Sequence, residues 1–403
     1  MRKKHFLFAS VLALLCSSST LHAQDFKLTS SGYFKNQGVD VMAFDDIYPE
    51  GHQGGVCIIM NGHRVATNGD IRLEATPGQW QPVPKQLDRK LGDNSITATL
   101  CYPDSSRHLT GFNPMIYPDL HLIYTVNVES KGKNIEVTVD LDRPIPQEFI
   151  GKVGFNLEFF PGSLFGKPWI MDGQSGIFPQ QPNSPLMTTQ PNYLHTGNYH
   201  DGKKSLADMD KLIGKGYSPI VADDIISEPY AKGTKFTSRP DDPYNKVTIE
   251  SLSGDLQLFD GRMNHNNGWF VLRSNIKPGV TKGAVKWIIT PNVVADWMYQ
   301  PVIQTSQIGY HPTQDKEAVI EMDIRDNRKE TAQIIRIDAD GEKVVKNVTP
   351  ANWGKFLRYN YLKVNFTDVK EPGLYKIKYN TSVSPIFRID NDVYARGVWQ
   401  PVL

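Results

Sequence analysis

The residues that could support catalysis or metal binding are few, and their spacing suits neither. His195 and His200 stand five positions apart, whereas a zinc pair on one helix face needs a separation of four. Three acidic pairs lack the spaced oxygen ligands of a calcium loop, so we interpret them as solvated surface. They are Asp45-Asp46, Asp223-Asp224 and Asp241-Asp242. Neither a Gly-rich phosphate loop nor a Gly-x-Ser-x-Gly nucleophile elbow occurs. These patterns predict no catalytic residue, no metal site and no cofactor.

Two cysteines follow the N-terminal segment, Cys57 and Cys101. Each lies in an apolar, strand-like run, at residues 56–60 and 96–102. Two interpretations stay open: a disulfide bond, which export would permit, and two small side chains buried in the core. A zinc site would need a closely spaced cysteine pair, and this sequence has none.

The composition is that of an ordinary globular protein of 403 residues, with 39% hydrophobic and 22% charged residues. Lys and Arg number 44 and Asp and Glu 43, so nucleic acid and anionic membrane are not expected as the main partner. No apolar run approaches the roughly 20 residues that span a membrane. The length suggests two or three domains, each with its own core.

Residues 1–23 have the pattern of a signal peptide. Three basic residues precede a short apolar stretch, and Ala23 offers a small side chain at the cleavage position. The mature chain would begin at Gln24 and lie in the periplasm or outside the cell. A lipid anchor on Cys16 is not favoured, because the bulky Leu15 precedes it.

Strand patterns dominate the mature chain, so we predict an all-β fold. Asn61-Gly62 predicts a two-residue hairpin turn, and Asn267-Gly268 predicts a second. One short helix is expected at residues 206–213, and residues 161–199 are rich enough in Gly, Pro, Gln and Asn to form a long loop. Residues 24–300 are therefore expected to form a large N-terminal β-sandwich domain.

Shorter, regular strands follow residue 300, with turn signals about every ten residues. They are residues 318–322, 333–337, 362–366 and 374–379. Leu362, Val364 and Phe366 share one face, as in a half-buried strand. This pattern predicts an immunoglobulin-like β-sandwich at residues 303–390, with the domain boundary between 296 and 306.

This second region also carries several separated motifs. They are Gln307-Ile308-Gly309-Tyr310, Phe366-Thr367-Asp368, Glu371-Pro372-Gly373-Leu374-Tyr375 and Ser384-Pro385-Ile386-Phe387-Arg388-Ile389. In this order they resemble the immunoglobulin-like module that precedes the catalytic barrel in many glycoside hydrolases of family nine, the cellulase and endoglucanase family. The resemblance covers residues 303–394. Residues 112–115 and 176–179 resemble the extra all-β domain of some exported bacterial members.

One of these motifs has a clear folding role. Pro372-Gly373 fits a type II turn, in which Pro fixes φ and Gly supplies a positive φ. The hydroxyl of Tyr375 can return to this turn, as tyrosine corners do in such sandwiches. These three residues are predicted to serve folding and not chemistry.

The resemblance implies degradation of β-glucan or cellulose-type polysaccharide by two carboxylates in a helical barrel, one of them in an Asp-Ala-Gly-Asp motif. Asp338-Ala339-Asp340-Gly341 departs from that motif in order and lies between two strand patterns, so we predict a hairpin turn. No catalytic residue is carried over. Residues 391–403, with Asp390 or Asn391 as a cap, are expected to form a short helical stub, the truncated first helix of the barrel.

Tryptophan rings can stack on sugars, although most fill sandwich cores. Trp169 and Asp172, in the predicted loop, are the proposed glycan contacts. The other candidates are Trp80, Trp269, Trp287 and Trp353.

Two functions are consistent with the sequence. In the first, the chain is the non-catalytic N-terminal portion of an exported family-nine glycoside hydrolase, inactive alone. It braces its partner, the catalytic barrel, and contacts plant or microbial β-glucan. In the alternative, it is a stand-alone glycan-binding or surface-assembly β-sandwich protein with no enzymatic role.

Overall fold

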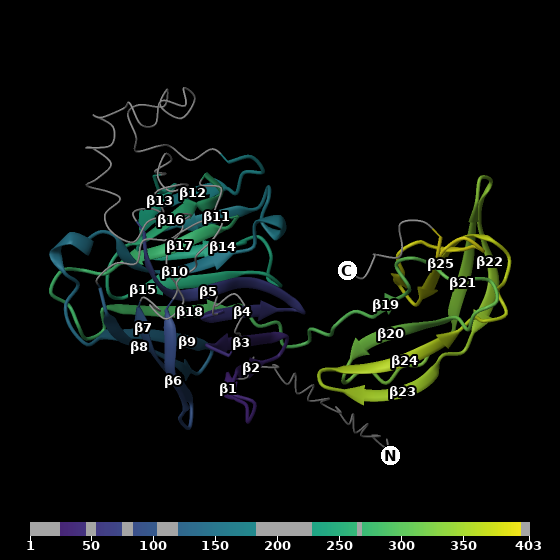
Figure 1. The fold of residues 1–403 in the computed structure, drawn as a ribbon, viewed down its shortest axis with the longest axis horizontal. Coiled ribbons are helices and arrows are strands. Elements are labelled where there is room, and N and C mark those ends of the chain that lie inside the picture. The colour runs from purple at the N-terminus through teal and green to yellow at the C-terminus, as the bar shows by residue number, and fades with distance from the viewer. Residues whose placement is uncertain are drawn as a thin grey trace, which may run out of the picture. The chain divides into compact units, whose positions relative to one another are not determined.

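The computed structural model describes residues 25–45, 54–74, 84–102, 120–182, 228–263 and 268–395. These residues form antiparallel sheets with three single-turn 3-10 helices, which confirms the all-β prediction (Figure 1). The 3-10 helices are η1 (Gln147–Phe149), η2 (Pro161–Ser163) and η3 (Gly261–Met263). The predicted signal peptide, the helix at 206–213 and Trp80 lie outside the described residues.

The chain divides into two compact units between Asp296 and Trp297. The sequence placed residues 297–300 in the first domain, whereas the structure places them in the second unit. Two hydrogen bonds explain the difference: Arg325 donates to the carbonyl oxygen of Trp297 (2.6 Å), and the amide of Tyr299 donates to Asp323 (3.0 Å). Both bonds join the start of the second unit to its own fold.

The first unit contains two nine-stranded sheets. In spatial order, one sheet consists of β1 (Lys27–Leu28), β2 (Phe34–Asn36), β3 (Val39–Ala43), β4 (Val56–Met60), β5 (His63–Leu73), β10 (Val153–Phe159), β17 (Phe270–Asn275), β16 (Leu256–Asp260) and β13 (Ala231–Gly233). The other consists of β12 (Gln174–Ile177), β11 (Pro168–Met171), β14 (Lys235–Ser238), β15 (Val247–Ser251), β18 (Val285–Pro291), β9 (Asn134–Leu141), β8 (Leu122–Lys131), β7 (Ser95–Tyr102) and β6 (Lys85–Leu91).

Alternating side chains of these sheets form one apolar core. In β7, for example, Ile96, Ala98 and Leu100 are buried, and the residues between them are half-buried. The ring of Trp287 meets that of Phe155 edge to face, with centroids 5.0 Å apart. Its Nε1 donates to Ser274 (3.0 Å), so this tryptophan is a core residue and presents no face to a ligand.

The Asn61-Gly62 hairpin is confirmed. Asn61 and Gly62 have φ of 52° and 84°, as a primed two-residue turn requires, and they join β4 to β5. The second predicted turn is wrong in length, because β16 ends at Asp260 and β17 begins at Phe270, with η3 between them. Asn267 itself lies outside the described residues.

The first part of the predicted long loop is instead a hairpin. Strands β11 and β12 pair there, and Asp172 takes the left-handed conformation (φ 49°) at the turn. The dipeptide Asp172-Gly173 is a hairpin signal, which the high Gly and Pro content of the surrounding segment obscured. Residues 183–199 lie outside the described part.

The second unit is a sandwich of a four-stranded and a five-stranded sheet. The first contains β19 (Val302–Gln304), β20 (Glu317–Asp323), β24 (Tyr359–Asn365) and β23 (Ala351–Phe356). The second contains β22 (Gly341–Val348), β21 (Ala332–Asp338), β25 (Gly373–Tyr379), β26 (Ser382–Val383) and β27 (Phe387–Ile389). All four strands predicted here are present, and residues 339–340 form the predicted turn between β21 and β22.

The chain after β27 is described only as far as residue 395. Within that stretch the amide of Ala395 donates to the carbonyl oxygen of Asp392 (2.8 Å), which makes a turn. The remainder of the predicted helical stub, residues 396–403, lies outside the described residues. No helix in the described part of the chain is long and apolar enough to cross a membrane.

Candidate functional site

Buried tyrosines connect loops to the core of the second unit. Tyr375 is 1% exposed and its hydroxyl donates to the carbonyl oxygen of Glu371 (2.8 Å). The hydroxyl of Tyr310 donates to the carbonyl oxygen of Glu317 (3.0 Å) and accepts from the amide of Ser306 (2.9 Å). These residues position the sheets and have no access to a substrate.

The type II turn predicted at Pro372-Gly373 is wrong. Gly373 has no positive φ; it is the first residue of β25 and pairs with Ile389 of β27. The strand pairing keeps this backbone extended, and that long-range contact overrides the local turn preference.

Gly309 is the glycine of these motifs that the fold requires. Its φ is 95°, and an added Cβ would overlap the carbonyl oxygen of Arg388. The close approach lets the amide of Tyr310 donate to that same oxygen (2.9 Å), which fastens the Gln307–Tyr310 motif to β27. A side chain at residue 309 would therefore separate the two segments.

Figure 1 labels the strands of the β19–β20–β24–β23 sheet, whose outer face carries aromatic side chains. In β24, Leu362 and Val364 face the core, so Tyr359 and Tyr361 face outward. A register shift between Asn352 and Gly354 places Trp353 at a β-bulge in the edge strand β23. Bulges redirect the side chain of the extra residue, and here that residue is a tryptophan.

The aromatic rings of this face contact one another in a row. Ring centroids are 5.5 Å apart for Trp353 and Tyr361, 6.1 Å for Tyr361 and Tyr359, and 5.1 Å for Tyr359 and Tyr299. The rings of Trp353 and Tyr361 are nearly perpendicular, at 88°. Beside them lies an apolar groove of about 220 Å³. Its lining residues are Val319, Trp353, Phe356, Tyr361 and Lys363.

The polar groups around this groove are already engaged. Glu321 accepts hydrogen bonds from the hydroxyls of Tyr299 (2.8 Å) and Tyr361 (3.3 Å). Lys363 forms an ion pair with Glu317 (2.9 Å). The pKa of Tyr299 is raised, first by burial and then by the neighbouring carboxylate of Glu321, so its hydroxyl stays a donor.

Trp169 and Asp172, the glycan contacts proposed from the sequence, both make contacts that stabilise the fold. Trp169 is 6% exposed, and an added Cβ on Gly176 would strike its indole ring. Asp172 accepts hydrogen bonds from the amides of Thr234 (2.8 Å) and Lys235 (3.0 Å), which fixes the start of β14. A glycan contact by either residue stays a prediction.

Two buried carboxyls in the first unit have the raised pKa that is typical of catalytic acids. Burial raises the pKa of Asp70 to about 6, although Arg72, at 3.7 Å, opposes the rise. Burial likewise raises the pKa of Glu74 to about 7 against the opposing charge of Arg273. Asp70 and Glu74 are 0% and 1% exposed, so no polysaccharide reaches them.

These carboxyls belong to a structural network across three strands. Arg273 of β17 forms an ion pair with Glu74 (3.2 Å) and donates to Asn156 of β10 (2.9 Å). It also donates to the carbonyl oxygens of Glu74 (3.0 Å) and Lys152 (2.8 Å). Removing one partner from such a buried pair costs about 3–5 kcal/mol. The network therefore stabilises the pairing of these neighbouring strands. Because its residues are buried, no substrate reaches it.

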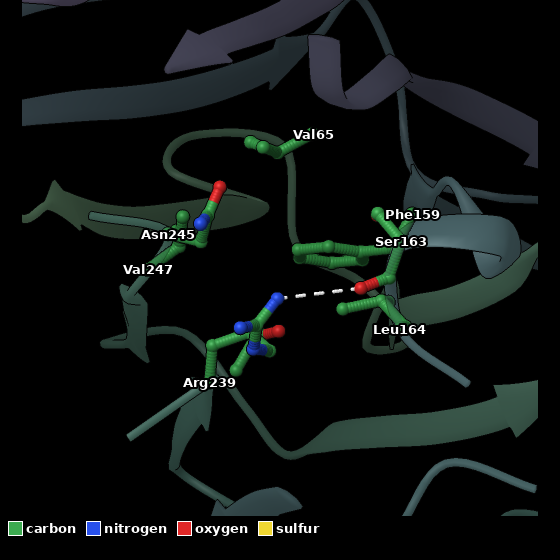
Figure 2. A pocket seen from close by; sticks show the side chains of 8 residues that line it. Val65, Phe159, Ser163, Leu164, Arg239, Asn245 and Val247 are labelled. Atoms are coloured by element: carbon green, nitrogen blue, oxygen red, sulfur yellow. Dashed lines mark hydrogen bonds between the residues drawn. The ribbon is translucent and has the colours of Figure 1, made fainter. Parts of the chain in front are cut away.

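A small hollow in the first unit is likewise unsuited to a ligand. Figure 2 shows its lining residues, with Arg239 donating to the carbonyl oxygen of Ser163 (3.3 Å). Arg239 also pairs with Asp242 (2.6 Å). The water-accessible space is about 10 Å³, room for about one water molecule.

The described residues contain no cluster of His, Cys, Asp or Glu that could hold a metal ion. His195, His200 and Asp223-Asp224 lie outside them. Cys57 of β4 and Cys101 of β7 lie in different sheets, and the structure records no disulfide bond between them.

Comparison with known proteins identifies part of the chain. Residues 298–384 match the family model of the cellulase N-terminal Ig-like domain. This segment is therefore similar to that domain family. It coincides with the β19–β26 sandwich, whose motifs already resembled the family-nine module. No curated protein matches the chain at a significant level.

Two solved structures show similarity to the chain. A metagenome-derived glycoside hydrolase family 9 endoglucanase is 29% identical over 22% of this chain, with a TM-score of 0.20. The matched part spans 18% of that endoglucanase. The Slr1438 protein from Synechocystis sp. PCC 6803 is 10% identical over 72% of this chain and all of its own, with a TM-score of 0.27. At these TM-scores neither neighbour defines the fold of the whole chain.

Of the aromatic row, the sequence indicated only Trp353 as a candidate sugar contact; Tyr299, Tyr359 and Tyr361 were missed, although a signal was present for two of them. Tyr359 and Tyr361 alternate with Asn360 and Leu362, which shows that both faces of β24 carry large apolar groups. The bulge that presents Trp353 has no comparable sequence pattern.

Proposed function

We propose that the chain is the non-catalytic N-terminal portion of an exported family-nine glycoside hydrolase that degrades β-glucan or cellulose-type polysaccharide. The observation that carries the proposal is the match of residues 298–384 to the cellulase N-terminal Ig-like domain. The endoglucanase neighbour, 29% identical over its matched part, agrees with it. The catalytic barrel of such an enzyme is the expected partner.

The Ig-like domain would brace and orient that barrel. A sandwich suits this task because its core is independent of the partner and its loops are fixed by buried hydrogen bonds. Tyr310 and Tyr375 provide such bonds. The buried positions of Asp70 and Glu74 support a chain that hydrolyses no polysaccharide by itself.

A binding and activity assay tests the bracing role. The mature chain, residues 24–403, is incubated with β-glucan, xyloglucan and carboxymethyl cellulose, alone and with an isolated family-nine catalytic domain. We expect no reducing ends from the chain alone and a higher melting temperature of the catalytic domain when the chain is present. Hydrolysis by the chain alone, or a melting temperature that does not change at saturating chain, would contradict the proposal.

Export rests on the signal-peptide pattern of residues 1–23. Expression of the chain with and without these residues in a bacterial host, followed by fractionation, tests it. We expect a periplasmic or extracellular protein that begins at Gln24 in the first case and a cytoplasmic protein in the second.

The outward-facing aromatic row, with Trp353 exposed, favours one alternative, a stand-alone glycan-binding or surface-assembly protein. The gene separates the two functions. A reading frame that continues beyond Leu403 into an Asp-Ala-Gly-Asp motif supports the hydrolase, whereas a stop codon directly after Leu403 supports the alternative.

A further inference from the structure

The outer face of the β19–β20–β24–β23 sheet exposes large apolar side chains that the fold does not need. An antiparallel sheet with one packed face normally presents polar residues to water on the other. Here Trp353 and Phe356 are each 56% exposed, and Leu357 in the turn after them is 78% exposed. Exposed apolar groups gathered on one face indicate a binding surface.

Two residues of the β23–β24 hairpin have energetically unfavourable backbone conformations. Leu357 has a φ of 51°, a conformation that Asn or Gly adopts more easily than Leu. Gly354, with a φ of 122°, completes the bulge that redirects Trp353. Conformations of this kind concentrate at functional sites.

The shape of the groove limits what can bind. Trp353 and Tyr361 form a right-angled corner, with the rings at 88°. A pyranose ring fits such a corner, because its C–H face stacks on one ring while its edge packs against the other. The volume of about 220 Å³ is below the roughly 300–1,000 Å³ of pockets for drug-sized ligands, so the corner holds about one sugar ring.

The charges beside the groove select the ligand further. Lys363 is paired with Glu317, and Glu321 accepts two tyrosine hydroxyls. The Lys363–Glu317 pair is electrically neutral, whereas the hydroxyls that bond Glu321 leave its negative charge in place. The groove therefore carries no excess positive charge and disfavours an anionic polymer. Lys363 and Glu321 retain polar atoms that sugar hydroxyls can bond.

We propose that this groove binds a segment of a neutral, β-linked glucan chain, with one pyranose ring in the corner of Trp353 and Tyr361. The proposal rests on the proposed function, because a polysaccharide-degrading protein meets such chains. It gives the Ig-like domain a glycan contact of its own, separate from its bracing role.

Affinity electrophoresis of the mature chain tests this site, with gels that contain neutral β-glucan, xyloglucan or anionic carboxymethyl cellulose. We expect the neutral polymers to retard the protein and Trp353→Ala to weaken binding about tenfold, the effect of losing one aromatic contact. Tyr244→Ala is the matched control, because Tyr244 is 47% exposed but lies in the first unit. Unchanged melting temperatures show that both variants fold.

Equal retardation of Trp353→Ala and the unsubstituted chain would overturn the proposal, as would the absence of retardation by either neutral polymer. Sedimentation provides a second test. If the chain forms a dimer that is lost in Trp353→Ala but persists when glucan is added, the face binds a second copy of the chain. These measurements contain no catalytic domain. A failure here therefore leaves the bracing role standing, and a failure of the bracing assay leaves the glucan site standing.

Discussion

The hydroxyl of Tyr375 donates a hydrogen bond of 2.8 Å to the carbonyl oxygen of Glu371, four residues earlier in the chain. This bond returns the loop before β25 to the core strand. The donor is a buried hydroxyl, whereas Glu371, which accepts the bond, is an exposed residue. Because Tyr375 is 1% exposed, water does not easily replace the lost hydroxyl.

Tyr375→Phe should destabilise the Ig-like domain by about 1 kcal/mol, the cost of losing one hydrogen bond made by a buried hydroxyl. Denaturant midpoints of the domain measure this change. Tyr361→Phe is the control: its hydroxyl lies on the outer face, 3.3 Å from Glu321, and its loss should cost less than about 0.5 kcal/mol. If the midpoint of Tyr375→Phe equalled that of the unsubstituted chain, the Tyr375 bond would contribute nothing.

Gly309→Ala should be far more disruptive than Gly373→Ala. At Gly309 the positive φ and the overlap with Arg388 act together, and we expect a loss of about 2–4 kcal/mol. At Gly373 the nearest atoms to an added Cβ lie at 3.5 Å and the backbone is extended, so Ala should be neutral or slightly stabilising. Thermal unfolding of the two variants gives the comparison, and the reverse order would contradict it.

Local sequence signals predicted this fold where the deciding interactions are local. Asn61-Gly62 specifies its hairpin turn by backbone preference alone, and the alternation of Leu362 and Val364 specifies the inner face of β24. Gly373 could not be predicted in the same way, because its conformation depends on pairing with Ile389. The sequence indicated Trp353 as a candidate sugar contact but not the groove beside it, because a bulge in an edge strand presents this side chain.

The burial of some polar residues in the first unit likewise could not be predicted from local sequence. Asp70 and Arg72 alternate along the end of β5 and Glu74 directly follows it, a pattern that is typical of a solvent-facing strand. In the structure Asp70 and Glu74 are fully buried, and partners from β10 and β17 surround Glu74. Those partners are distant in the sequence, so the pattern of one strand cannot reveal them.

The two units should unfold as separate cores. Their apolar clusters share no residue, and Arg325 and Asp323 hold the start of the second unit from residue 297 onward. We expect limited proteolysis to cut near residues 293–296 and to leave a fragment that begins close to Trp297. Calorimetry should show two transitions. One cooperative transition together with resistance to cleavage at this segment would contradict the prediction.

The stability of the first unit should fall as pH rises through the titration of Asp70. Its pKa is about 6 in the folded protein against an ordinary value of 3.8, because burial disfavours the carboxylate. The folded state therefore keeps a proton that the unfolded chain has released between these values. The resulting stabilisation is complete below about pH 4 and lost above about pH 6, and the shift corresponds to about 3 kcal/mol.

Asp70→Asn removes this titration while its amide oxygen can still accept the hydrogen bonds from Tyr124 (2.9 Å) and the amide of Ile71 (2.7 Å). We expect the variant to lose less stability than the unsubstituted chain between pH 4.5 and pH 7.5, with a remaining slope from Glu74, whose pKa is about 7. Urea unfolding followed by the fluorescence of the buried Trp287 measures it, and Asp255→Asn, at an exposed residue, is the control. If Asp70→Asn and Asp255→Asn gave the same pH profile, Asp70 would already be ionised at low pH in the folded protein.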